Sequence, residues 1–205
     1  MAQKHIGMYM NLSDRVFDHF AESIKAKQDN QELLAEATAA AIELMFAALV
    51  NDGKVLACGN GGSAADAQHF AAELVGRFEM ERMGLAGIAL TTDTSALTAI
   101  ANDYDFNRIF SKQVEALGRS GDVLLAISTS GNSANIIAAI EAAHERDMRV
   151  VALTGKDGGK IAHILQDQDI LLNVAHPRTA RIQEIHILLI HAICDGIDQL
   201  LMGNV

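Results

Sequence analysis

The chain has 205 residues, of which half are hydrophobic and a fifth are charged, and its formal net charge is −10. This length and composition support one large globular core, and a chain with a single proline and no low-complexity tract is not expected to be disordered. The negative charge argues against a general nucleic-acid-binding surface, so an anionic ligand would need a local binding loop.

The first 50 residues predict a long helical region. Apolar residues recur every four positions between 12 and 24, and a second apolar stripe follows between 31 and 51. The two stripes consist of Leu12, Val16, Phe20 and Ile24, and of Leu34, Ala37, Ala41, Leu44 and Ala48. Ser13 or Asp14 is expected to cap the start, and Asn51-Asp52-Gly53 is expected to end the region as a turn.

Beyond residue 51, short apolar runs alternate with helical patterns. The predicted strands are 54–59, 88–92, 122–129, 149–155 and 169–175, and the predicted helices are 63–83, 94–117, 133–146, 157–166 and 178–202. The strands are continuous apolar runs, which is typical of strands covered by helices on both faces. The predicted fold class is therefore α/β, a doubly wound parallel five-stranded sheet flanked by helices, with residues 1–50 as a helical extension of the unit formed by 51–205.

The cysteines and the apolar runs indicate the compartment. Cys58 and Cys194 show no paired spacing, so we expect reduced thiols. The first ten residues lack the apolar core of a signal peptide, and the apolar stretch 39–50 contains Glu43 and is shorter than the ~20 residues of a membrane span. We therefore expect a cytoplasmic protein that neither spans nor binds a membrane.

Three loops follow strands at the edge where parallel sheets bind ligands. The first, Gly59 to Ser63, is rich in glycine and suits either a close backbone approach to a ligand or a tight turn. The second, 128–133, reads STSGNS and opens a helix, and its four hydroxyls exceed what an N-cap needs. Neutral donors beside free helix N–H groups predict a phosphate site there. The third, 154–159, is either a second anion site or a surface turn.

Two predicted helices carry residues suited to chemistry. His69 and Glu73 are four residues apart, so both can reach one point, where they could bind a divalent metal, act as base and acid, or simply form a surface pair. In the final helix, Gln183 and His191 interrupt an apolar stripe and could equally be satisfied core residues. These two lie ~12 Å apart along the helix, so they reach one ion only with extended side chains or from different subunits.

The segments CGNGGS, LLAISTSGNS and ALTGKDGG together resemble the sugar isomerase (SIS) domain family over about residues 50–200. The further segments HFAAEL, ANDY and ARIQEIH are similar to the phosphoheptose isomerase family within it. The resemblance implies zinc bound by His69, Glu73, Gln183 and His191, and catalysis by Glu73 and His191. It also implies that the sugar phosphate contacts Asn60, Gly61, Gly62, Glu73, Asn102, Asp103, Ser128, Thr129, Ser130, Ser133 and Gln183. We add Ser63, from the first loop, to these expected contacts.

The resemblance also implies an activity and an assembly. The activity is conversion of D-sedoheptulose 7-phosphate to D-glycero-D-manno-heptose 7-phosphate through an enediol(ate), the first step towards ADP-heptose and the lipopolysaccharide core. The assembly is a homotetramer around a helical core, with sites at subunit interfaces. The alternative is a non-catalytic tetrameric relative that binds the replication initiator DnaA, but that relative lacks counterparts of Glu73 and His191. Ala180 departs from isomerases that carry an acidic residue before the arginine of RIQE.

Overall fold

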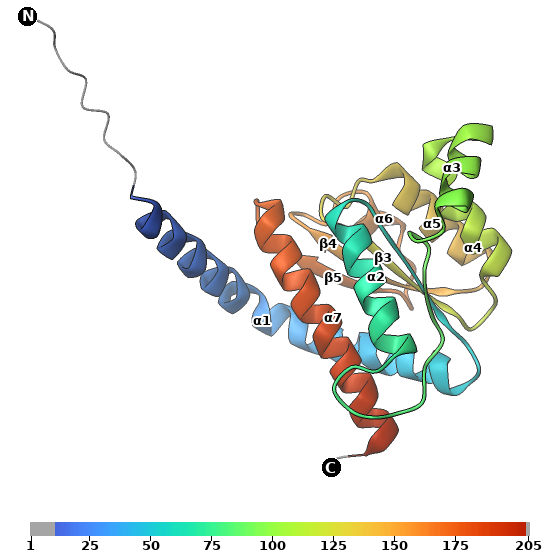
Figure 1. Ribbon diagram of the computed structural model, residues 1–205, viewed down its shortest axis with the longest axis horizontal. Coiled ribbons are helices and arrows are strands. Elements are labelled where there is room, and N and C mark those ends of the chain that lie inside the picture. Colours follow the sequence, from blue (N-terminus) through green and yellow to red (C-terminus); the bar gives the residue numbers. More distant parts are fainter. Residues whose placement is uncertain (1–10, 204–205) are drawn as a thin grey trace, which may run out of the picture.

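Five parallel strands form the centre of the fold, in the order β2-β1-β3-β4-β5 (Figure 1). The structure is a computed structural model that describes residues 11–203. The strands are β1 (Val55–Gly59), β2 (Gly87–Ala89), β3 (Val123–Ser128), β4 (Arg149–Gly155) and β5 (Ile170–Val174). Every pairing between neighbours is parallel. The predicted α/β fold class is confirmed, whereas the leader 1–10, in which we expect no signal peptide, lies outside the described residues.

Helices cover both faces of this sheet. They are α1 (Leu12–Val50), α2 (Gly62–Val75), α3 (Thr94–Asp103), the 3-10 turn η1 (Phe106–Arg108), α4 (Ser111–Leu117), α5 (Ala134–Glu145), α6 (Ile161–Ile164) and α7 (Thr179–Met202). Alternate strand residues point into two separate cores: Val55 and Leu125 pack with α1, α2 and α7, while Leu56 and Leu124 pack with α4 and α5. The continuous apolar runs are thus explained by burial on both faces.

The strand order creates a switch point between β1 and β3. The chain leaves β1 towards β2 on one side, whereas β3 and the later strands extend on the other side. The loops that follow the two central strands therefore lead to helices on opposite faces of the sheet. In open α/β folds, ligands bind in the crevice between such loops, at the carboxyl edge of the sheet. The loops predicted to bind a ligand, 59–63 and 128–133, are the ones that flank this crevice.

Helix α1 is one continuous helix of 39 residues, which contains both predicted apolar stripes. Its second half packs in the core through Leu34, Ala41 and Ala48, as predicted. Its first half projects beyond the sheet (Figure 1), and the apolar stripe that includes Phe20 and Ile24 is exposed. The predicted cap is wrong: Asn11 caps the helix, and its side chain accepts a hydrogen bond from the backbone of Ser13.

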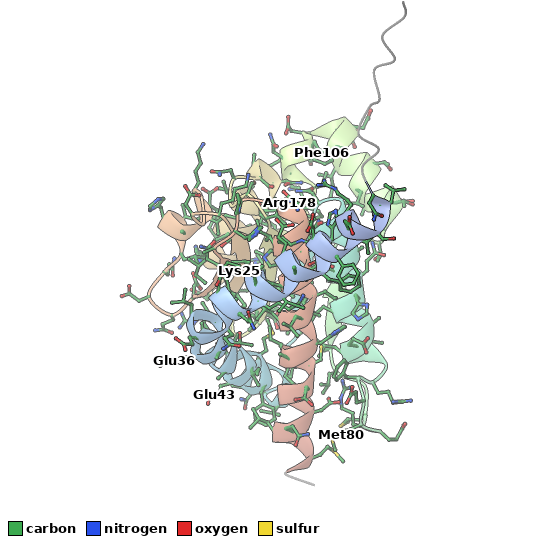
Figure 2. The ribbon with its side chains drawn as sticks, turned by 90° about the vertical axis from the view of Figure 1, so that its left-hand side faces the viewer. Lys25, Glu36, Glu43, Met80, Phe106 and Arg178 are labelled. Atoms are coloured by element: carbon green, nitrogen blue, oxygen red, sulfur yellow. The ribbon has the colours of Figure 1, made fainter. Side chains whose placement is uncertain are left out.

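Polar contacts attach this projecting half to the start of α7. Arg181 donates to the carbonyl oxygen of His19 at 2.6 Å, and Ser23 donates to Glu184 at 2.7 Å. Arg178 pairs with Glu22, and Figure 2 shows Arg178 beside α1 where that helix passes in front of α7. The long helix is therefore held to the helix that carries Gln183 and His191.

Several predicted boundaries are wrong. The predicted helix 63–83 ends at Val75 and is followed by a loop. Gly76 is its C-cap residue, and the side chain of Arg82 donates hydrogen bonds to the last carbonyl groups of the helix. The predicted strand 88–92 keeps only Gly87–Ala89, and the region 94–117 divides into α3, η1 and α4. The observed ends of the other four strands agree with the predicted ends within one or two residues, because both coincide with the limits of burial.

Two described helices, α1 and α7, are long and apolar enough to cross a membrane by length and composition alone. Core helices pass the same test, and here α7 and the second half of α1 bury one face against the sheet. The expectation that the chain has no membrane span stays a prediction. Cys58 and Cys194 are both free and buried, on opposite faces of the sheet, which agrees with the predicted thiols.

Candidate active site

The two loops at the switch point are joined by a pair of side-chain amides. Asn60, which follows β1, and Asn135, in the first turn of α5, exchange hydrogen bonds of 2.9 and 2.8 Å. Asn135 is 3% exposed, so its amide is fixed by burial and holds Asn60 in turn. Gly61 has a φ of +57°, and a Cβ added to it would meet no atom within 4 Å. The backbone there is therefore open to a ligand.

The hydroxyl loop does not use its side chains to cap α5. Ser133 is the N-cap residue, yet its side chain makes no capping hydrogen bond and lies 3.0 Å from the hydroxyl of Ser128 instead. Ser130 accepts a hydrogen bond from the backbone of Asn132 at 3.1 Å. Helix α2 likewise has no side-chain cap at its N-cap residue Gly61, and the same holds for α4, α6 and α7, whereas α1 and α3 are capped by Asn11 and Asp93. Without a capping side chain, the first backbone N–H groups of α2 and α5 can bind an anion.

The third strand-end loop supports the second. A Cβ added to Gly131, whose φ is +64°, would lie 1.9 Å from the carbonyl oxygen of Gly158. Lys160 donates its backbone N–H to the side chain of Asn132 at 3.1 Å, and Ile161 donates to Gly131 at 3.0 Å. Within the described residues, loop 154–159 is therefore a packing partner of the hydroxyl loop, and this favours the interpretation of it as a structural turn.

Helices α2 and α7 lie side by side (Figure 1), and a second group of polar residues lies on the face where they meet. Both helices begin at the carboxyl edge of the sheet and run parallel. His69 on α2 lies 3.0 Å from His191 on α7, Nε2 to Nε2, and 3.1 Å from the Oε1 of Glu73. The His69 and Glu73 side chains are 43% and 22% exposed, so the group is open to a ligand. Sequence positions 122 residues apart thus meet at one point.

Gln183, the fourth predicted zinc ligand, lies nearer the start of α2. A Cβ added to Gly62 would lie 2.4 Å from the side-chain nitrogen of Gln183, so that amide packs directly on the glycine. Gly62 precedes His69 by seven residues, or ~10 Å of helix. The structure therefore places His191 and Glu73 against His69 in one protomer and leaves Gln183 about two helical turns away.

The donor set on this face suits zinc. Two imidazoles and a carboxylate are ligands of catalytic zinc sites, and two donor atoms ~2.0–2.1 Å from a tetrahedral ion lie ~3.3 Å apart. The observed separations of 3.0 and 3.1 Å are close to that value. One proton on His69 Nε2 cannot satisfy both neighbours well, whereas a cation can. Among residues 11–203, however, no group of three or more His, Cys, Asp or Glu side chains is placed so that it could hold a metal ion, so these three residues do not form a metal site within one protomer.

The structure adds residues that the sequence analysis missed. Phe78, in the loop after α2, places its ring 5.6 Å from that of His191. Asp66 lies one turn before His69. Burial raises the pKa of Asp66, opposed by the charge of His69, and its Oδ2 is buried without a hydrogen-bond partner in the part of the chain that the structure describes. Burial first, and then the charges of Glu73 and Asp198, raise the pKa of the Cys194 thiol to about 12. Of these three residues, Asp66 alone could have been found from the sequence, through its three-residue spacing from His69.

Two predicted substrate contacts lie apart from these groups. Asn102 and Asp103 are exposed at the end of α3, where the Asn102 amide donates to Asp103 at 2.8 Å. Ser63, by contrast, is 4% exposed inside the first turn of α2, and Thr129 follows β3 beside Ser128. In the described part of the chain, the side-chain hydrogen bonds of α3 stay within that helix and its cap, and a role for Asn102 and Asp103 stays a prediction.

This chain is similar to known proteins both in sequence and in structure. The SIS domain family model matches residues 19–155. A phosphoheptose isomerase of Neisseria meningitidis serogroup C is 73% identical over 191 residues, which are 93% of this chain and 97% of that protein.

Two solved structures have the same fold throughout. The phosphoheptose isomerase GmhA from Neisseria gonorrhoeae is 69% identical in sequence and has a TM-score of 0.88. The match covers 92% of this chain and 100% of the GmhA chain. A phosphoheptose isomerase from Francisella tularensis is 47% identical and has a TM-score of 0.90. This match covers 93% of this chain and 100% of the Francisella chain. The chain therefore belongs to the SIS domain family and, within it, to the phosphoheptose isomerases, a family of isomerase enzymes.

Proposed function

We propose that the protein converts D-sedoheptulose 7-phosphate to D-glycero-D-manno-heptose 7-phosphate, with zinc as its metal. The observation that carries the proposal is the meeting of His69, Glu73 and His191 on parallel helices that start beside a neutral anion cradle. The isomerase relatives support it further, and none of the relatives quoted above is named as a DnaA-binding protein. In this role the enzyme acts in the cytoplasm at the start of ADP-heptose synthesis for the lipopolysaccharide core.

The phosphate end of the substrate is assigned to the crevice. Backbone amides at the start of α5 and the hydroxyls of Ser128, Thr129, Ser130 and Ser133 donate to its oxygens. The reacting carbons are assigned to the α2–α7 face, ~10 Å further along α2. This separation suits a long sugar phosphate better than a triose phosphate, because the carbon chain has to reach from one group to the other. Anchoring the remote phosphate in this way orients C1 and C2.

The isomerisation moves one proton between carbons and one between oxygens. Glu73 accepts the proton from C1, which gives the enediol(ate), and returns it to C2; His191 transfers the proton between the two oxygens. Oε1 of Glu73 contacts His69, so Oε2 is the oxygen assigned to the carbon-bound proton. A zinc ion held by His69, Glu73, Gln183 and His191 would polarise the carbonyl oxygen as a Lewis acid. His69 orients Glu73 and the Phe78 ring supports His191.

We further propose that copies of the chain form a homotetramer that completes the site. The position of Gln183 in one protomer supports this, because Gln183 lies too far from His69, Glu73 and His191 to share an ion with them unless it comes from a neighbouring copy. An apolar groove of about 450 Å³ between α1 and α7 and the exposed Phe20 and Ile24 supply surfaces for helix packing. Such surfaces are common at interfaces and costly to leave in water.

The assembly is tested by sedimentation of purified protein. The double variant Phe20→Asp/Ile24→Asp should dissociate the tetramer and lose zinc affinity with it, because charges replace the apolar contact. Leu117→Asp, at an exposed leucine on α4, is the matched control and should leave the assembly unchanged. A wild-type protein that sediments as a monomer at assay concentration contradicts the proposal.

The activity is tested by incubating the purified protein with sedoheptulose 7-phosphate and measuring aldoheptose phosphate. A chelator should remove activity and added zinc should restore it. Glu73→Gln should lower kcat at least 1000-fold while circular dichroism stays unchanged, since the amide cannot accept the proton. Glu141→Gln, at an exposed position of α5, makes the same chemical change and should retain activity. A wild type that forms no product with zinc supplied would sink the enzyme proposal, and a DnaA pull-down would then test the alternative.

A further inference from the structure

A buried ion pair joins the loop after α2 to the end of α7. Arg82 Nε lies 2.5 Å from Asp198 Oδ1, and the two side chains are 2% and 1% exposed. The other oxygen, Oδ2, is buried without a hydrogen-bond partner in the described part of the chain, so Arg82 provides the main compensation for this carboxylate. Burying two charges carries a desolvation cost, and apolar residues of similar volume often stabilise a fold as well. The pair is therefore better explained by what it holds in place.

The guanidinium holds the C-terminal end of α2. Its terminal nitrogens donate to the carbonyl oxygens of Glu73 at 2.8 Å, Leu74 at 2.9 Å and Met83 at 3.1 Å. The last carbonyl groups of a helix have no partner within the helix, and a positive charge there also interacts favourably with the helix dipole. Arg82 thus caps α2 from a loop, and Asp198 fixes that cap to α7.

The same connection bears on the proposed reaction centre. One of the two capped carbonyl groups belongs to Glu73 itself. On α7, Asp198 follows His191 by seven residues, which places the two ~20° apart around the helix and ~10 Å apart along it. His191 and Asp198 therefore face α2 together, one in contact with His69 and the other with Arg82. Figure 2 shows Met80, from the same loop, beside the C-terminal end of α7.

We propose that Arg82 and Asp198 are positioning residues, whose buried pair fixes α2 against α7 and so holds His69 and Glu73 at the separation from His191 that the reaction needs. The inference rests on the proposed function for its effect on kcat. Its effect on metal affinity does not need turnover, because the same three side chains supply the ligands.

The test compares Arg82→Lys, Asp198→Asn and the double variant Arg82→Met/Asp198→Leu with wild type. Zinc affinity is measured by competition with a chromophoric chelator, kcat and KM by the isomerase assay, and stability by urea unfolding. The control is Lys54→Met, which removes another largely buried ion pair of 2.5 Å, with Asp122, at the amino-terminal ends of the central strands. Lys54 precedes β1 and Asp122 precedes β3, so this pair lies away from both proposed binding groups.

We expect Arg82→Lys to lower kcat about 10- to 100-fold, with KM within about threefold, because the reacting groups shift while the phosphate loop is untouched. Zinc affinity should fall about tenfold, as it does when groups that orient ligands are lost. The double variant should recover stability, since apolar residues replace the pair, yet keep the low kcat and weak zinc binding, since the cap on α2 is gone. Lys54→Met should lose stability alone.

The outcomes separate this inference from the proposed function. If Lys54→Met lowers kcat and zinc affinity as much as Arg82→Lys, or if the double variant regains wild-type values, the pair only stabilises the fold and the inference is wrong. If wild type has no isomerase activity but Arg82→Lys still weakens zinc binding selectively, the proposed function fails and the positioning role stands. Unchanged kcat and zinc affinity in Arg82→Lys and Asp198→Asn would overturn it.

Discussion

A buried histidine should make the stability of this fold depend on pH. His186 on α7 is fully buried, and its Nε2–H donates to the carbonyl oxygen of Thr154 at 2.9 Å. Its Nδ1 has no hydrogen-bond partner among residues 11–203. Burial lowers the pKa of His186 from 6.5 to about 4, although the bond to Thr154 opposes the shift. The folded state therefore keeps a neutral imidazole at a pH where the unfolded chain binds a proton.

The direction and size of the effect follow from proton linkage. Because the pKa of His186 is lower in the folded state, its contribution is fully present above pH ~6.5 and is lost as the pH falls towards about 4. For these two pKa values, the free energy of unfolding should drop by ~2 kcal/mol between pH 7 and pH 5 through this residue alone. The difference of about 2.5 between the two pKa values corresponds to a full loss of ~3 kcal/mol in the free energy of unfolding, which is complete below pH ~4.

The assay is urea unfolding of wild type and His186→Gln at one protein concentration, from pH 7.5 to pH 4.5. Glutamine cannot titrate in this range but keeps an N–H donor for Thr154. Carboxylates and the other histidines titrate equally in both proteins, so the difference between the two curves isolates His186. We expect the wild type to lose ~2 kcal/mol more than the variant between pH 7 and pH 5. Parallel curves would refute the argument that burial keeps this imidazole neutral.

Two glycine substitutions test the loops of the candidate site. Gly131→Ala should destabilise the fold by at least ~2 kcal/mol and raise KM, because the new methyl group meets the backbone of Gly158 and the residue has a positive φ; an unchanged melting temperature and KM would contradict this. Gly62→Ala should leave the melting temperature nearly unchanged, because only the flexible end of Gln183 must move, but lower zinc affinity about tenfold. Chelator competition measures that affinity, and wild-type binding would show that the position of Gln183 is immaterial.

Much of the fold could be predicted because it depends on local patterns. A continuous apolar run such as 149–155 marks a strand buried on both faces, and the observed β4 has the same bounds. The final helix likewise followed from the stripe of Ile182, Ile185 and Ile193, all of them buried. Glycine loops after such strands then predict a ligand site, because the strand ends share one edge of the sheet.

The errors occur where distant residues decide. The pattern of α2 continues to residue 83, but the helix ends at Val75 because Arg82 returns to its last carbonyl groups and pairs with Asp198, 116 residues later. The cap of α1 is the exception, because Asn11 bonds the nearby Ser13 and stands immediately before the first apolar residue, where a local rule places an N-cap. Asn135 and Phe78 owe their place in the candidate site to contacts with Asn60 and His191, which no local spacing reveals.

The topology explains why two segments so far apart in sequence form one site. Helices α2 and α7 both leave the carboxyl edge of the sheet, so residues at equal depth along them lie side by side. Gly62 is opposite Gln183, and His69, seven residues deeper, is opposite His191, eight residues deeper. Each step along a helix turns the side chain by 100°, so seven or eight residues restore the same face. The imidazoles therefore meet because two helices share an origin, and their separation depends on the axial register between those helices, which is the quantity that Arg82 and Asp198 control.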